Sequence, residues 1–136
     1  MVDDATAAYI LETSKCFEDL KQVAAQIAGV LVLAEAGGNS ATPDHPLLQS
    51  AAELHREALD QVRSARPTEA ARPHHQFLLQ AADALTRALA VHRMDTAAIL
   101  PPVRDAYGFL HRAANALPGF QMVAFEQGCC AVRVIS

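Results

Sequence analysis

Residues 74–92 read HHQFLLQAADALTRALAVH and carry the clearest helical pattern in the chain. Apolar side chains recur three or four residues apart, which is the spacing of one face of an α-helix. Asp83 and Arg87 lie on the opposite side at a separation of four residues, where opposite charges on a helix are neighbours. The stretch therefore predicts an amphipathic helix with one buried face. The residues expected on that face are His74, Phe77, Leu78, Ala81, Leu85, Ala88, Leu89 and His92.

Three further stretches show the same periodicity. The first covers residues 4–36, with an aspartate at its start and Gly37-Gly38 at its end, and the second follows Pro46 and runs to about residue 65. The last is expected to start at Pro101-Pro102, because proline lacks an N–H and clashes with the preceding turn of a helix. It should end at Pro118-Gly119, and Gly108 within it is expected to mark a close helix crossing.

The composition supports an all-α fold. Hydrophobic residues make up 51% of the 136 residues, yet aromatic residues make up only 5% and there is no tryptophan. An all-β sandwich would require more β-branched and aromatic residues in short runs. We therefore predict an antiparallel four-helix bundle over residues 1–119, with an extension, 120–136, packed on the same domain. Two interpretations of that extension stay open, a short β-hairpin and a fifth helix.

Charge and targeting signals exclude several classes of partner. A formal net charge of −4 offers no basic surface for nucleic acid. No apolar stretch approaches the roughly 20 residues that a membrane-spanning helix needs, and the amino terminus lacks the basic and apolar regions of a signal peptide. Three cysteines are too few and too irregular for a disulfide framework. These features predict a cytoplasmic protein that binds neither nucleic acid nor membrane.

Four residues are candidates for binding a small molecule or a metal. His55 falls on an apolar helix face, Tyr107 is another inward polar side chain, and Cys129 and Cys130 are adjacent thiols. A buried imidazole must be hydrogen bonded or bound to a ligand, and thiols bind soft metals. The simpler expectation is that His55 is a satisfied core residue and that the cysteines behave as small hydrophobic residues.

Motifs for metal, cofactor or catalytic chemistry are absent from the sequence. No histidine has a glutamate three residues before it, as di-iron bundles require. The sequence also lacks the H-E-x-x-H, C-x-x-C, nucleotide-binding and serine-hydrolase motifs. We therefore predict no cofactor and no catalytic residue, and an enzyme acting through His74 or His75 ranks last among the hypotheses.

Some apolar residues have no evident local partner. Some of them lie on a second side of the first helix, 4–36, and others lie in the extension, 120–136. A helix that is apolar on more than one side needs more than one neighbour. Central burial is the preferred explanation, and a subunit interface is the alternative. The candidate interface residues are Val30, Val32, Leu33, Phe120, Val123 and Phe125.

These observations lead to two functional hypotheses. The first is a non-enzymatic helical interaction or accessory module that binds a protein partner or associates with itself as a homodimer. The second is a helical bundle that binds a small molecule or a metal through the inward histidine and the adjacent cysteines.

Overall fold

The computed structural model describes residues 3–37, 45–91 and 96–117, and all regular secondary structure in these ranges is α-helical. This confirms the predicted all-α helical bundle. The helices are α1 (Asp4–Gly37), α2 (Pro46–Ser64), α3 (Arg72–Leu89) and α4 (Thr96–Ala114). The ends of α1 and α2 agree with the sequence prediction to within about one residue.

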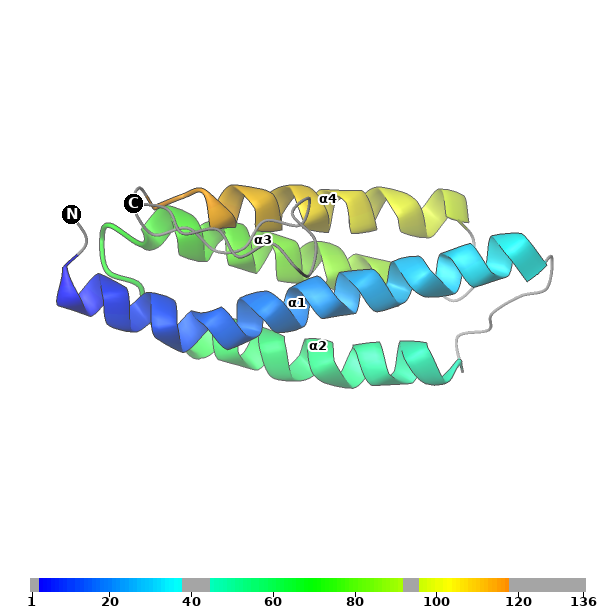
Figure 1. Cartoon of the computed structure of the whole chain (residues 1–136), viewed down its shortest axis with the longest axis horizontal. Helices are drawn as coiled ribbons and strands as arrows, with labels where there is room; N and C mark the ends of the chain where they lie inside the picture. Colours follow the sequence, from blue (N-terminus) through cyan, green and yellow to red (C-terminus); the bar gives the residue numbers. More distant parts are fainter. Residues whose placement is uncertain (1–2, 38–44, 92–95, 118–136) are drawn as a thin grey trace, which may run out of the picture.

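The bundle consists of two closely packed helix pairs. The most extensive contacts are between α3 and α4 and between α1 and α2, whereas α1 touches α4 and α3 over smaller areas. Figure 1 shows the chain running in one direction along α1 and α3 and returning along α2 and α4. Figure 1 also shows the carboxyl end of α1 extending beyond the ends of α2 and α4.

Local side-chain bonds fix where two helices begin. Asp3 Oδ1 accepts a hydrogen bond from the backbone N–H of Thr6 at 2.7 Å. Hydrogen bonding to Thr6 lowers the pKa of the Asp3 carboxyl. His45 caps α2 by accepting the N–H of Leu47 at 3.1 Å. Pro46 in the first turn of α2 needs no N–H partner, since the first N–H groups of a helix have none within the helix.

One continuous core joins all four helices. Its fully buried side chains include Phe17 and Leu20 of α1, Val62 of α2, Leu85 of α3 and Leu110 of α4. The inward leucines predicted from the helical pattern, Leu48, Leu78, Leu85 and Leu110, are buried, and Leu59 is partly buried against the same core. Burial of these faces supplies the main driving force for folding.

The predicted start of α4 is wrong. The helix begins at Thr96, and Pro101 and Pro102 lie inside it. Two intrahelical hydrogen bonds are lost because neither proline has an N–H. Tertiary contacts hold the preceding turn, since Ile99 is completely buried and the hydroxyl of Thr96 donates to Glu35 of α1 at 2.7 Å. These contacts favour a helical turn that the prolines alone disfavour.

Gly108 does not mark a close helix crossing. A Cβ atom added at this position would meet nothing within 4 Å. The residue is exposed on α4, so the packing of the described residues gives no reason for a glycine.

None of the described helices is long and apolar enough to cross a membrane. The predicted extension, 120–136, and its boundary at 119 lie outside the described residues.

Gly108 provides a direct test of this packing. We expect Gly108→Ala to raise the free energy of unfolding by roughly 0.5–1 kcal/mol, because alanine loses less backbone entropy in a helix and has open space here. Urea unfolding followed by circular dichroism measures the change. A decrease in stability would show that another group occupies this space.

Candidate functional site

His55 joins α2 to α3 through its imidazole. Its Nε2–H lies 2.9 Å from the carbonyl oxygen of Ala82 and 3.2 Å from Thr86 Oγ1, and the Thr86 hydroxyl donates to the same carbonyl at 2.9 Å. The side chain is 6% exposed. His55 is therefore a buried residue whose Nε2 is hydrogen bonded within the protein, which is the simpler of the two expectations stated for it.

A second polar cluster lies at the other end of α3, where its first turn meets α1. Tyr9 Oη and His74 Nδ1 are 3.0 Å apart, and the two rings meet edge to face with centroids 5.5 Å apart. His74 is 1% exposed, and burial, with a smaller effect from His75, lowers its pKa to about 4. Burial also raises the pKa of Tyr9. Both side chains are therefore neutral near pH 7.

His75 and two threonines complete this cluster. His75 Nε2–H donates to the carbonyl oxygen of Val62 at 2.8 Å, and so satisfies one of the last carbonyls of α2, which lack partners within the helix. Thr6 Oγ1 and Thr68 Oγ1 are 2.6 Å apart, and this hydrogen bond joins α1 to the loop between α2 and α3. Each of these contacts joins chain segments, as expected of structural hydrogen bonds.

The cluster lacks the partners that acid–base catalysis requires. Within the described part of the chain, His74 bonds to the phenol of Tyr9 and His75 bonds to a backbone carbonyl, and neither bonds to a carboxylate. His74 Nε2 is buried without a hydrogen-bond partner. A neutral imidazole of low pKa in an apolar environment is a weak base, so the geometry gives no support to a catalytic role.

Of the other predicted ligand residues, the structure describes Tyr107 alone. Tyr107 is half-buried on α4, and burial raises its pKa. Cys129 and Cys130 lie outside the described residues. In residues 3–37, 45–91 and 96–117, no group of three or more histidine, cysteine, aspartate or glutamate side chains is placed to hold a metal ion.

The candidate interface residues of α1 divide into two environments. Val30 is completely buried in the core, whereas Val32 is 66% exposed and Leu33 is 55% exposed. Central burial, the preferred explanation, therefore holds for Val30 and fails for Val32 and Leu33. The candidates Phe120, Val123 and Phe125 are beyond the residues that the structure describes.

Val32 also lines an apolar groove between the carboxyl end of α1 and the first turns of α4. The groove has a volume of about 490 Å³. Its two polar side chains, Glu35 and Thr96, bond to each other. The lining residues are Ala28, Leu31, Val32, Glu35, Ala36, Thr96 and Leu100.

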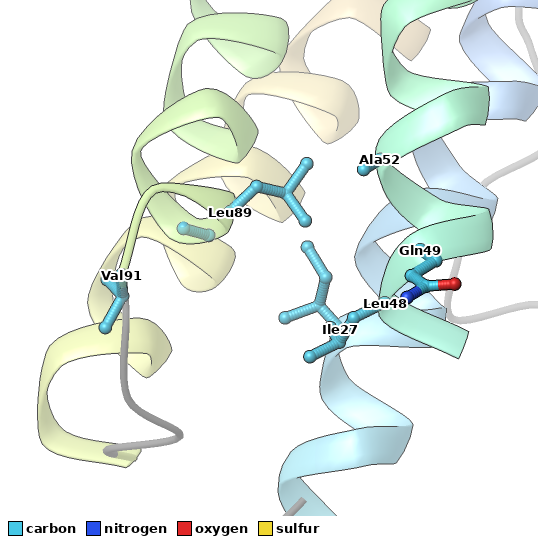
Figure 2. Close-up of a pocket in the computed structure, with 7 residues that line it drawn as sticks. Ile27, Leu48, Gln49, Ala52, Leu89 and Val91 are labelled. Carbon is cyan, nitrogen blue, oxygen red and sulfur yellow. The ribbon is translucent and has the colours of Figure 1, made fainter. Parts of the chain in front are cut away.

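A smaller cavity lies between α1, α2 and the end of α3. Figure 2 shows Ile27 and Leu89 converging on it from α1 and α3, and its volume is about 140 Å³. Gln49 contributes the single polar side chain of its lining. Neither His55 nor Tyr107 lines this cavity or the groove.

Sequence reasoning missed the polar cluster and the α4 side of the groove. Tyr9, Thr13 and Cys16 form a buried stripe next to the predicted apolar stripe of α1, and their spacing was a signal for this second inward row. Leu100 and Thr96 were missed because the prolines displaced the predicted start of α4.

Comparison with known proteins adds no functional information. The chain matches no family model, and no curated protein or solved structure is significantly similar to it.

His74 should make stability depend on pH. Its pKa is about 4 in the folded protein and about 6.5 in an unfolded chain. Below pH 6.5 the unfolded chain binds a proton that the folded protein excludes, so stability is complete above pH 6.5 and falls as the pH decreases towards 4. The shift corresponds to about 3 kcal/mol.

Urea unfolding between pH 7 and pH 4 measures this dependence. We expect the wild-type protein to lose about 3 kcal/mol more than His74→Gln over this range. Gln76→Ala, at an exposed position of the same helix that carries no titratable group, is the control and should retain the wild-type profile. Equal profiles for the wild type and His74→Gln would show that folding does not lower the pKa of His74.

Proposed function

We propose that the protein is a non-enzymatic helical interaction module that binds a protein partner through the carboxyl-terminal part of α1. The observation that carries this proposal is the exposure of Val32 and Leu33, at 66% and 55%, beside an apolar groove. Full burial of a valine or leucine side chain contributes roughly 1.5–3 kcal/mol, so covering this surface favours association.

The contrast with Leu11 supports the proposal. Leu11 is 72% exposed on the same helix, but it lies about 30 Å from Val32 along the helix axis. Single exposed apolar residues are normal on protein surfaces. Val32 instead lines the apolar groove, and the exposed Leu33 follows it directly in the sequence.

The polar atoms of the groove favour an apolar occupant. Glu35 and Thr96 bond to each other at 2.7 Å, and the remaining lining residues are alanine, leucine and valine. A ligand recognised by hydrogen bonds would need polar groups that converge on it. A helix with an apolar side could bind here without such polar groups, because its binding depends on complementary shape and on the apolar surface that it covers.

A reducing, cytoplasmic location is part of this proposal. It is supported by the small number of cysteines and by Cys16, a free thiol that is completely buried. Burial raises the pKa of the Cys16 thiol to about 11, so this cysteine is a packing residue with little thiolate character.

The cavity shown in Figure 2 favours the alternative function, binding of a small molecule. Its volume of about 140 Å³ is close to that of apolar cavities that bind benzene. This alternative predicts that a small apolar ligand raises the midpoint of thermal unfolding. An unchanged midpoint at ligand saturation would contradict it.

Site-specific photo-crosslinking in the source cell tests the interaction function. We expect p-benzoylphenylalanine at Val32 to give discrete crosslinked products, because this position faces the proposed partner. The same group at Glu53, an exposed position on α2, is the control and should give none. Equal yields at both positions, or no product at Val32, would contradict an interaction at this surface.

A further inference from the structure

We infer that the partner at this surface is a second copy of the chain, bound by two-fold pairing of the carboxyl-terminal halves of two α1 helices. This inference rests on the proposed function and identifies the partner. The contact runs along a seam of Lys21, Ala25, Ala28, Val32 and Glu35. Their spacing alternates between four and three residues, as in the contact positions of paired helices.

The described monomer leaves this seam largely open to contact. Ala25, Val32 and Glu35 are exposed and Ala28 is half-buried, and the Lys21 side chain is 24% exposed. Ala28, Val32 and Glu35 also line the groove beside α4. At its carboxyl-terminal end the seam borders the start of α4, where Glu35 bonds to Thr96, and Val32 remains 66% exposed.

The charged residues of one seam are complementary to those of a second copy that runs in the opposite direction. Lys21 and Glu35 lie seven residues on either side of Ala28, which is almost two turns, so all three share one side of the helix. When two copies pair in opposite directions about Ala28, Lys21 lies opposite Glu35 of the second copy, and this pair forms twice. Val32 then lies within one residue of Ala25 of the second copy.

Side-chain contacts keep both charged groups beside the seam. Glu35 accepts a hydrogen bond from Thr96, and Lys21 pairs with Glu18 at 3.2 Å. Partial ordering before association lowers the entropy lost when a charged pair forms across an interface. Oppositely charged residues at the edges of paired helices also set their direction and partner.

Gly29, next to Ala28 in the sequence, leaves room for close approach of a second helix. A glycine inside a helix costs roughly 1 kcal/mol relative to alanine, and an added Cβ at Gly29 would meet nothing within 4 Å. The described monomer therefore does not need a glycine at this position. Beside Ala28 at the two-fold axis, its missing side chain lets the two helix backbones approach closely.

Native mass spectrometry and sedimentation of the full chain test this inference. We expect the wild-type protein to be a dimer at micromolar concentration. Gly29→Glu should be monomeric, because two like charges would meet near the axis. Gly108→Glu is the matched control, since Gly108 also has open space but lies on α4, and it should remain dimeric.

Charge reversal tests the direction of pairing. Lys21→Glu and Glu35→Lys should each raise the dissociation constant of the dimer at least tenfold, because each places like charges opposite one another twice. The double variant Lys21→Glu/Glu35→Lys should recover dimerisation. An equimolar mixture of the two single variants should give a heterodimer, in which both opposed pairs are again attractive.

Further controls separate loss of pairing from loss of folding. Lys15→Glu reverses another lysine of α1 that pairs with an aspartate outside the seam, and it should remain dimeric. Circular dichroism should show equal helix content in all variants. A variant that loses helix content is replaced by Gly29→Glu, because a Cβ atom added at Gly29 enters open space.

The outcomes distinguish this inference from the proposed function. A monomeric wild-type protein, or a dimer that persists in Gly29→Glu, overturns the α1 pairing. A heterodimer from the two single variants supports it. A crosslinked product at Val32 that contains a different protein and never two copies of this chain overturns self-pairing and leaves the interaction function standing.

Discussion

The length of α1 is the constraint on which the rest of the structure depends. α1 has 34 residues, whereas the other three helices have 18 or 19. At 1.5 Å per residue, α1 is about 51 Å long and its neighbours are about 28 Å. Shorter helices cannot cover its whole apolar surface. Around Val32 the uncovered part is one side of the helix, because Leu31 and Ala34 of the same turn pack against the core and Glu35 bonds to Thr96 of α4.

The rest of the bundle is closely packed, unlike the exposed surface around Val32. The interior contains side chains from all four helices, including many alanines that allow close approach. Its polar side chains are mostly bonded across helix boundaries, as His55 is to α3 and His75 to the end of α2. Such bonds offset the cost of removing polar groups from water. They also explain why the histidines, the first residues to suggest chemistry, act as structural links.

The predicted helices followed from patterns that are local in the sequence. The ends of α1 and α2 were predicted because aspartate, glycine and proline act within one turn of their own position. Asp83 and Arg87 form the expected ion pair at 2.7 Å for the same reason. The start of α4 was not predicted, because Ile99 and Thr96 gain their stabilising contacts from other helices. Local propensity at Pro101 and Pro102 was outweighed by those contacts.

The sequence by itself determined that this chain forms four amphipathic helices and the main apolar row that each one buries, because a 3.6-residue period specifies a face without reference to any neighbour. Only the tertiary structure decided which polar groups pair and which apolar residues stay uncovered. Thr6 meets Thr68 and Glu35 meets Thr96 across more than 60 residues of chain. Val30 is buried while Val32 is exposed, because a residue's burial depends on where the neighbouring helices lie and end.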